Sequence, residues 1–330
     1  MSGELLKIDD LHVSFFTPAG EVKAVNGISY TLEHGKVLGI VGESGSGKSV
    51  SANALMQLIP YPGRVTEGQI TFDEQDILGM PIQDMRKLRG KEIGMIFQDP
   101  MTSLNPVFTI GNQLVETLMQ HTDMTKAQAF ERGVEMLKLV GINNPEQRMK
   151  QYPYEFSGGM RQRAMIAMTL SCEPKLLIAD EPTTALDVTI QAQILELIKE
   201  LKDKINSAII LITHDLGIIS DLCDEVIVMY AGRIVEKGSI DDIFYRTAHP
   251  YTQGLLRCLP RLDSDDKDPL IPIEGTPVDL VALPDGCAFA SRCEKCLKLC
   301  LKHQPELMQI NEGHTSACWL HAIEKQEVGA

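Results

Sequence analysis

Apolar and polar residues follow two alternating patterns along the chain. Short apolar runs rich in β-branched residues are typical of buried strands, and the amphipathic segments between them are typical of helices that connect parallel strands. We predict buried strands at residues 36–41, 93–97, 176–179, 208–213 and 226–230. This order of patterns indicates an α/β fold.

Two segments carry helical periodicity. Residues 189–201 place apolar side chains three and four positions apart, at Ile190, Ile194, Leu197, Ile198 and Leu201. This spacing forms one face of an amphipathic helix. Residues 109–140 show helical periodicity without strand signals, so we predict a mainly helical insertion in the α/β core there.

The chain is longer than one ordinary domain needs. It has 330 residues, of which 44% are hydrophobic and 23% are charged, whereas a domain commonly takes roughly 100–200 residues. This composition supports a sizeable core and excludes a largely disordered protein. Aspartates and prolines crowd residues 260–284, which predicts an irregular connection between a large unit and a smaller one.

Net charge and the length of the apolar runs limit the partners. Lys and Arg number 31 against 45 Asp and Glu, so the formal net charge is −14 and nucleic acid is a poor partner. The apolar runs fall short of the ~18–20 residues that span a bilayer, and the first residues lack the features of a secretory signal. We expect a reducing cytosol, in which the eight cysteines form no disulfide framework.

A glycine-rich loop follows the first predicted buried strand. Its sequence, Gly42-Glu43-Ser44-Gly45-Ser46-Gly47-Lys48-Ser49, fits G-x-x-x-x-G-K-S and precedes a helix-compatible run. Glycines let backbone N–H groups turn around phosphate oxygens, and the start of a helix adds positive potential. Lys48 is then the residue that reaches the β- and γ-phosphates of a nucleotide, and Ser49 is a ligand for Mg²⁺.

Two acids end the strand predicted at residues 176–179. Asp180 is placed to hold magnesium through water, and Glu181 to act as the general base that polarises the attacking water. The alternative is that both acids cap the turn that starts at Pro182. His214 follows the next predicted strand and is expected at the same edge of the sheet.

Together these residues resemble the ATP-binding cassette (ABC) ATPases over roughly residues 5–250. The segment Phe156-Ser157-Gly158-Gly159-Met160 resembles the family's signature, Leu-Ser-Gly-Gly-Gln, with Phe in place of Leu and Met in place of Gln. The resemblance identifies further residues: the switch histidine His214, the Q-loop glutamine and magnesium ligand Gln98, the D-loop Ala185-Leu186-Asp187, and the adenine-stacking Phe15, next to Phe16. It implies a P-loop ABC fold with a mixed or parallel sheet and a helical subdomain at about residues 100–172.

The resemblance also implies how the ATP site is completed. Two ATPase subunits of this family close head to tail over two ATP molecules. Each site combines Ser157 and Gly159 of one chain with residues of the other, namely Lys48, Ser49, Asp180, Glu181 and His214. The partners implied are a second ABC ATPase subunit, in a heterodimer or a homodimer, and two membrane permease subunits. Such a chain lies peripherally at the cytoplasmic face of the cell membrane.

The last part of the chain resembles one branch of this family, the peptide and nickel importers. His249-Pro250-Tyr251-Thr252 and the segment from Gly286 to Cys318 carry that resemblance. It implies the ATP-hydrolysing D-type subunit of a dipeptide or oligopeptide importer, which an extracytoplasmic peptide-binding protein serves indirectly. An importer of nickel or another small solute is an alternative, and a non-transport ABC ATPase is another that the acidic charge disfavours.

Four cysteines near the end are spaced as C-x5-C-x6-C-x17-C, at Cys287, Cys293, Cys300 and Cys318. In a reducing compartment such thiols suit metal, and four of them fit either tetrahedral zinc or a [4Fe–4S] cluster. The resemblance favours [4Fe–4S]. Cys296 is an additional thiol, which we interpret as a nearby free thiol; if the segment is helical, it falls on one face with Cys293 and Cys300 and could replace one of them as a ligand. His303 and His314 keep a mixed zinc site as the second possibility.

These observations predict two domains. Residues 1–257 form the ATP-binding cassette, and residues 258–330 form a small cysteine-rich iron–sulfur domain. Because this tail is short and poor in aromatic residues, we expect the cluster to hold it together, as metals do in small domains. The expected cofactors are ATP, Mg²⁺ and [4Fe–4S].

Overall fold

The structure is a computed structural model that describes residues 3–99, 103–183, 188–205, 207–259 and 272–322. Contacts group the chain into two compact units, which are described separately. Unit 1 comprises Met1–Leu5, Leu32–Lys36 and Gly79–Ile212, and unit 2 comprises Leu6–Thr31, Val37–Leu78 and Thr213–Ala330. The domain boundary expected between residues 257 and 258 lies inside unit 2 and stays a prediction.

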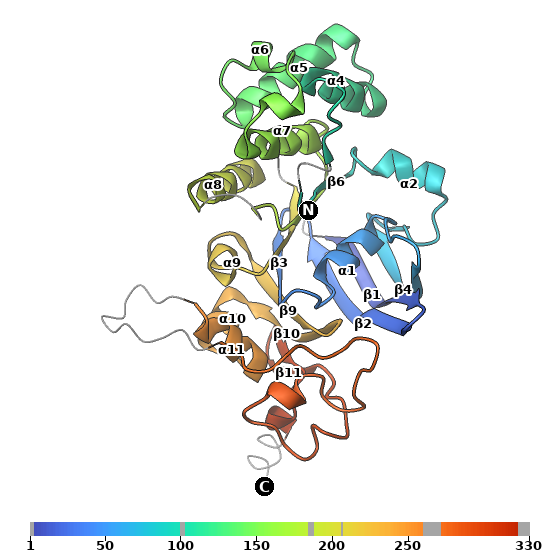
Figure 1. The fold of residues 1–330 in the computed structure, drawn as a ribbon, viewed down its shortest axis with the longest axis vertical. Coiled ribbons are helices and arrows are strands. Elements are labelled where there is room, and N and C mark those ends of the chain that lie inside the picture. The colour runs from blue at the N-terminus through green and yellow to red at the C-terminus, as the bar shows by residue number, and fades with distance from the viewer. Residues whose placement is uncertain (1–2, 100–102, 184–187, 206, 260–271, 323–330) are drawn as a thin grey trace, which may run out of the picture. The chain divides into compact units, whose positions relative to one another are not determined.

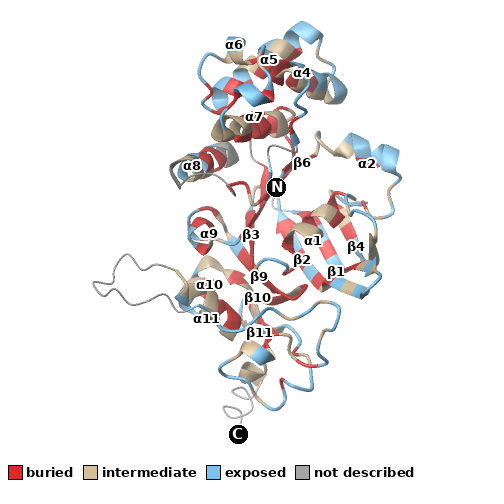
Figure 2. Ribbon diagram, viewed as in Figure 1, coloured by how far each residue is buried: buried red, intermediate tan, exposed pale blue. Residues whose placement is uncertain are grey.

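Parallel strands form the core of unit 1. Strand β7 (Leu176–Asp180) lies between β6 (Ile93–Ile96) and β8 (Ala208–Thr213), and both pairs are parallel. Every residue of the three strands is buried; Figure 2 draws buried residues in red. Apolar runs of this kind are covered on both faces in parallel sheets. These strands confirm three of the predicted positions.

Helices make up most of the remainder of unit 1 (Figure 1). The helices are α2 (Ile82–Leu88), α4 (Ile110–His121), α5 (Lys126–Leu139), α6 (Pro145–Arg148), η1 (Pro153–Glu155), α7 (Gly158–Leu170) and α8 (Val188–Ile205). Helices α4, α5 and α7 pack against one another, and Thr125 and Gln128 form a capping box at the start of α5. The helical insertion is confirmed.

Helix α8 confirms the predicted amphipathic helix. Ile194, Leu197 and Ile198 are buried on it, as the three-and-four spacing requires. Ile190 is half-buried, and the side chain of Leu201 lies outside what the structure describes.

Unit 2 contains an antiparallel sheet that the apolar pattern did not predict. Its strands are β1 (Glu4–Thr17), β2 (Gly20–Glu33), β4 (Gly63–Phe72) and β5 (Gln75–Asp76), in the order β2-β1-β4-β5. Strands β1 and β4 pair antiparallel, with Leu6 opposite Phe72 and Ile8 opposite Ile70. Buried and exposed residues partly alternate along them, as expected for an antiparallel sheet with one solvated face.

A second group of strands in unit 2 supports the glycine-rich loop. Strand β3 (Val37–Val41) is parallel to β9 (Glu225–Tyr230), which pairs antiparallel with β10 (Arg233–Ser239). The helices of this unit are α1 (Lys48–Leu55), α9 (Leu216–Leu222), α10 (Ile240–Tyr245) and α11 (Pro250–Arg257). Strands β3 and β9 confirm the two remaining strand predictions.

The end of the chain continues the same group of strands. Strand β12 (His314–Ser316) pairs with β10, and β11 (Met308–Asn311) pairs with β12. A short 3-10 helix, η2 (Ala290–Arg292), lies in the cysteine-rich segment. Residues 272–284 contain no helix or strand, which agrees with an irregular connection, and residues 260–271 lie outside the described ranges.

The helices were also compared with the length of a bilayer span. Among the described residues, no helix is long and apolar enough to cross a membrane.

Candidate functional site

Strand β3, the glycine-rich loop and helix α1 form the strand–loop–helix arrangement that the motif requires. The loop takes positive φ angles at Gly42 (152°), Gly45 (79°) and Gly47 (100°). An added Cβ at Gly42 lies 2.2 Å from the Met229 carbonyl oxygen, and one at Gly47 lies 2.3 Å from the Ala24 carbonyl oxygen. Side chains are therefore excluded at both positions by backbone contact as well as by conformation.

Lys48 points back into this loop and is buried. Its ammonium group donates to the carbonyl oxygens of Gly42 (2.7 Å) and Glu43 (3.0 Å) and lies 3.4 Å from the hydroxyl of Ser46. Ser44 and Gly45 are exposed at the opposite side of the loop. The loop thus holds a positive charge at its centre and presents open backbone, which is the arrangement that binds phosphate.

Two further predicted residues of unit 2, Ser49 and His214, lie at the ends of secondary structure. Ser49 is half-buried in the first turn of α1. His214 is exposed directly after β8, and the next residue, Asp215, caps α9 by accepting from the N–H of Gly217 at 2.8 Å. Asp215 therefore has a local structural role that fixes where the strand-to-helix turn places His214.

Unit 1 brings together the predicted general base and the Q-loop glutamine. The side-chain amide of Gln98 donates to Glu181 Oε2 at 2.9 Å. Asp180 is buried at the end of β7, and the backbone N–H of Glu181 donates to the carbonyl of Ile212 at 2.9 Å. Glu181 has φ of 46°, in the left-handed region that is uncommon for a non-glycine residue and recurs at functional sites.

The signature segment begins helix α7. Ser157 is the N-cap, and its hydroxyl accepts from the N–H of Met160 at 3.3 Å. Gly159 is close-packed, because an added Cβ would lie 2.8 Å from Ile190 Cγ2 on α8. The guanidinium of Arg161 donates to the carbonyl of Phe156 at 2.8 Å and fixes the chain that leads into the helix. Exposed Ser157 stands at the positive end of a thirteen-residue helix.

The two aromatic candidates for adenine stacking differ in environment. Phe15 is half-buried on β1 and packs so closely on Gly63 that an added Cβ there would lie 2.5 Å from its ring. Phe16 is 40% exposed, and the guanidinium of Arg64 lies 4.3 Å from its ring centre. The stacking role of Phe15 stays a prediction.

The predicted site residues therefore divide between the two units. The glycine-rich loop, Phe15 and His214 belong to unit 2, and the residues of unit 1 are Gln98, Asp180, Glu181, Ser157 and Gly159. The proposed D-loop residues Ala185, Leu186 and Asp187 lie outside the described residues. Asp180 ends a strand and Ser157 begins a helix, as the sequence indicated, whereas Phe15 lies within β1.

The four predicted cluster cysteines all lie in unit 2. Burial raises the pKa of Cys287 to about 12, opposed by a backbone hydrogen bond at Phe289 and supported by the neighbouring thiols of Cys300, Cys318 and Cys293; burial also raises the pKa of Cys318 to about 11. The N–H of Cys287 also donates to the carbonyl of Cys300 at 2.7 Å. Four free thiols are thus gathered in one partly buried region.

The segment around Cys296 is not helical, because residues 293–300 form successive turns. Cys296 is exposed, whereas Cys300 is buried. The N–H groups of Cys296 and Cys300 donate three residues back, to Cys293 and Leu297. The helical arrangement that would place Cys296 beside Cys293 and Cys300 is therefore absent, and the interpretation of Cys296 as a nearby free thiol stays a prediction.

His314, one of the two histidines considered for zinc, makes a different contact. It is fully buried on β12, and its Nε2 lies 2.8 Å from Glu236 Oε1 on β10. The same carboxylate accepts from the N–H groups of Ala248 (2.7 Å) and His249 (3.0 Å). This network attaches the end of the chain to the sheet.

Sequence reasoning missed the contact between the end of the chain and the glycine-rich loop. Arg292, next to Cys293, forms a two-pronged ion pair with Glu43, with N–O distances of 2.6 and 2.9 Å. The hydroxyl of Tyr251 accepts from the N–H of Glu43 at 2.8 Å. Residues 43 and 292 are 249 positions apart, and no local pattern signals such a pair.

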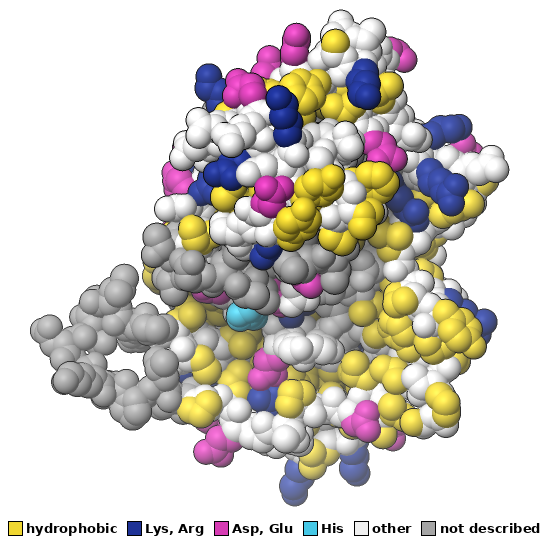
Figure 3. Space-filling model, turned by 45° about the horizontal axis from the view of Figure 1, so that its top comes forward, with side chains coloured by type: hydrophobic (Ala, Val, Ile, Leu, Met, Phe, Trp, Pro, Cys, Tyr) yellow, Lys and Arg dark blue, Asp and Glu magenta, His cyan; other side chains and the backbone are white. Residues whose placement is uncertain are grey.

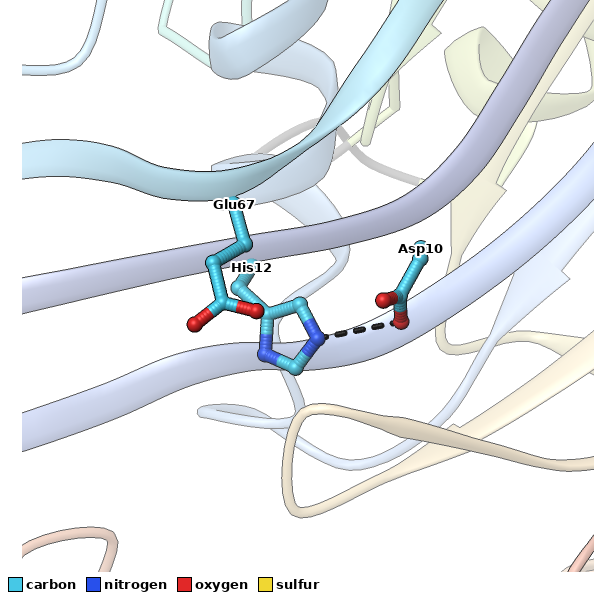
Figure 4. A group of neighbouring side chains, drawn as sticks. All are labelled: Asp10, His12 and Glu67. Atoms are coloured by element: carbon cyan, nitrogen blue, oxygen red, sulfur yellow. Dashed lines mark hydrogen bonds and ion pairs between the residues drawn. The ribbon is translucent and has the colours of Figure 1, made fainter.

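A further group, Asp10, His12 and Glu67, lies on β1 and β4 (Figure 4). Their ligand atoms all lie within 4.8 Å of one another, and His12 Nε2 lies 3.0 Å from Asp10 Oδ1. Register shifts on either side of His12 mark an irregular strand pairing that brings the three side chains together. Exposed acidic groups such as these are common without a metal.

Two protein-family models match the chain. Residues 25–184 match "ABC transporter", and residues 235–300 match "Oligopeptide/dipeptide transporter, C-terminal region". The second match covers the His-Pro-Tyr segment and three of the four predicted cluster cysteines.

Relatives match almost the whole chain. The oligopeptide transport ATP-binding protein OppD of Salmonella typhimurium is 54% identical over 315 residues, which cover 96% of this chain and 93% of that protein. OppD of Bacillus subtilis is 53% identical over 96% of this chain and 88% of that protein. The dipeptide transport ATP-binding protein DppD of the same organism is 52% identical over 96% of this chain and 95% of that protein.

Solved structures show the same fold. The ATP-binding cassette MJ0796, in a dimeric post-hydrolysis state bound to ADP and phosphate, has a TM-score of 0.65 at 24% identity and covers 72% of this chain and 99% of its own.

Proposed function

The chain belongs to the ABC transporter family, among the oligopeptide and dipeptide transport ATP-binding proteins, and on that premise we propose that it drives peptide import through separate permease subunits. It is an ATPase of that family. The observation that carries the proposal is the fully formed phosphate loop around Lys48 in a chain that matches these proteins over 96% of its length.

Each residue near the phosphates has a proposed role. The backbone of residues 42–47 surrounds the phosphates, with the N–H of Glu43 held by the Tyr251 hydroxyl, and Lys48 contacts the β- and γ-phosphates. Ser49, Gln98 and Asp180 would hold Mg²⁺, the last through water, and the ion neutralises phosphate charge. His214 contacts the γ-phosphate.

Glu181 is the proposed general base. The side-chain amide of Gln98 donates to Glu181 Oε2 at 2.9 Å, which orients the carboxylate that polarises the attacking water. The left-handed backbone of Glu181 turns the chain away from β7 immediately after Asp180. The two adjacent acids therefore have different proposed roles: Asp180 binds the metal, and Glu181 accepts the proton.

We further propose that two ATPase subunits share each ATP. The start of α7 carries exposed Ser157 and the N–H groups of its first turn, although this chain has its own phosphate loop at Gly42–Ser49. Ser157 and Gly159 therefore serve the nucleotide of a second ATPase subunit. That subunit is a different ABC ATPase in a heterodimer or a second copy in a homodimer.

Exposed apolar side chains in unit 1 support docking to permease subunits. Val107 is 70% exposed and Tyr154 is 69% exposed. The N–H of Ile110 donates to the carbonyl of Gln151, so the two chain segments run close to each other. Figure 3 shows hydrophobic side chains gathered between charged ones on the surface it presents. Apolar surface with a charged rim is typical of protein–protein contacts.

Uptake of labelled substrates tests this function. Cells that lack the chain are complemented with the wild type or with Lys48→Ala, and uptake of a labelled dipeptide, a labelled oligopeptide and labelled nickel is measured. We expect the wild type alone to restore uptake of one or both peptides. Restoration of nickel uptake alone would favour the small-solute alternative, and no restoration would argue against an importer.

We also propose a [4Fe–4S] cluster held by Cys287, Cys293, Cys300 and Cys318. Four free thiols in one region supply a suitable donor set. Tetrahedral zinc is the alternative for the same four thiolates.

Anaerobic purification with iron, sulfide and zinc analysis tests the cluster. We expect a brown protein with about four irons per chain, the loss of iron in Cys300→Ser, and its retention in the matched variant Cys296→Ser. A colourless zinc protein would refute the cluster. We propose that the cluster has a structural role, and removal of iron with the tail still folded would contradict that role.

A further inference from the structure

Arg292 is an almost buried arginine whose contacts lead away from the cysteines. Its side chain is 3% exposed and forms the two-pronged ion pair with Glu43 of the phosphate loop. The guanidinium of Arg292 also donates to the carbonyl oxygens of Glu274 (3.0 Å) and Ile273 (3.2 Å) and to the hydroxyl of Tyr230 (3.4 Å). A guanidinium fixed on so many sides has a defined orientation, which a lysine ammonium does not reproduce.

Glu43 is the point at which the end of the chain meets the phosphate loop. Arg292 binds its carboxylate, and the Tyr251 hydroxyl accepts from its N–H. Its carbonyl oxygen accepts from Lys48 at 3.0 Å. All three polar parts of one loop residue are therefore engaged, two by residues beyond position 250 and one by the lysine that contacts phosphate.

The surroundings of this ion pair make it rigid. The rings of Tyr230, Tyr251 and Phe289 pack against one another, with centroid separations of 4.7 to 5.3 Å. Arg292 lies 5.9 Å from the ring centres of Tyr230 and Phe289. Glu43 and Pro277 line the same small cavity, so the chain after residue 272 runs beside the loop.

We propose that Arg292 is a positioning residue for ATP: through Glu43 it fixes the phosphate loop, so that the cysteine-bearing end of the chain sets the affinity for ATP. The inference rests on the proposed ATP site. Arg292 is assigned no contact with ATP itself. It acts by holding the Glu43 peptide, and with it Lys48, in the geometry that receives phosphate.

Nucleotide binding and steady-state hydrolysis test this role. The variants are Arg292→Gln, Glu43→Gln, the double variant and Arg292→Lys, each titrated with a fluorescent ATP analogue and Mg²⁺ and assayed for kcat and KM. We expect Arg292→Gln and Glu43→Gln each to raise Kd and KM for ATP about 10-fold or more, with kcat changed less than about 3-fold. Arg292→Lys should restore only part of the affinity.

Non-additivity separates positioning through Glu43 from a general weakening of the fold. If the pair acts as one unit, the double variant binds ATP no more weakly than the weaker single variant. The matched control is Arg257→Gln, because Arg257 pairs with Glu294 at 3.2 Å on an exposed surface of the same region. It should change Kd less than about 2-fold. Glu43→Gln lies outside the tail, so it tests the role even if Arg292→Gln does not fold.

Two results would overturn the inference. One is wild-type ATP affinity in folded Arg292→Gln or Glu43→Gln, and the other is losses that multiply in the double variant. Failure of the wild type to bind ATP would instead contradict the proposed function, so the two ideas fail separately.

Discussion

Replacing Glu236 by Leu should detach the end of the chain from the sheet. Glu236 has no exposed surface, and its carboxylate accepts three hydrogen bonds, from the N–H groups of Ala248 and His249 and from His314. Leucine leaves these buried donors without an acceptor. Each unsatisfied buried donor costs about 1–3 kcal/mol, so we expect a loss of about 3–6 kcal/mol after partial relaxation of the structure.

The single tryptophan makes this loss measurable at the place where it occurs. Trp319 lies three residues after β12, and its indole N–H donates to the carbonyl of His303 at 2.9 Å. Its fluorescence during urea unfolding therefore reports on the end of the chain, while circular dichroism reports on both units. We expect the fluorescence transition of Glu236→Leu to move to lower urea before the bulk of the helix signal is lost.

A matched variant separates burial from charge. Glu225→Leu removes an acid on the neighbouring strand β9 that pairs with Lys237 at 3.3 Å and is 53% exposed. We expect a change below about 1 kcal/mol there. If Glu236→Leu lowered the free energy of unfolding by no more than Glu225→Leu does, the argument that the unsatisfied buried donors cause the loss would be refuted.

Three more outcomes follow from the structure. Gly47→Ala should weaken ATP binding about 100-fold or more in a nucleotide titration, because its Cβ would meet the Ala24 carbonyl at 2.3 Å; unchanged affinity would contradict the loop geometry. Burial, and then the charge of His321, lowers the pKa of His249 from 6.5 to about 3. Between these two pH values the unfolded chain binds a proton at His249 that the folded chain does not, so the free energy of unfolding falls by about 1.4 kcal/mol for each pH unit below 6.5. His249→Asn, which keeps a helix-capping acceptor, should flatten that slope in urea titrations at pH 5 and 7. Gln98→Ala should lower kcat about 10-fold or more and also weaken binding of Mg²⁺ and ATP, because Glu181 loses the hydrogen bond from Gln98 and the metal loses a ligand; a wild-type kcat would contradict these roles.

The buried strands could be predicted from sequence because burial on both faces leaves continuous apolar runs. Strand β7 is an example, with five buried residues that end in Asp180. The antiparallel sheet of unit 2 gave a weaker signal. In β1 the register shifts around His12 interrupt the alternation of apolar and polar residues, so no uniform period of two exists to be recognised.

In the candidate site, too, residues that lie close together in the sequence were predicted, and contacts between distant residues were not. The phosphate loop was predictable because its glycines, lysine and serine lie within eight consecutive positions and each has a local conformational or chemical reason. The pair of Arg292 and Glu43 was not, since charged residues on loops carry no periodicity. The cysteine spacing predicted a ligand set, which stays a prediction, and only the structure shows that turns, and no helix, carry residues 293–300.

The central claim is that this chain hydrolyses ATP with Glu181 as the base, and turnover by Glu181→Gln tests it most directly. The substituted amide keeps an oxygen that accepts from Gln98, so the local structure is preserved while proton acceptance is lost. We expect ATP to remain bound in the presence of Mg²⁺, and hydrolysis to fall about 100-fold or more relative to the wild type. Hydrolysis at the wild-type rate would contradict the assignment of Glu181 and the mechanism built on it.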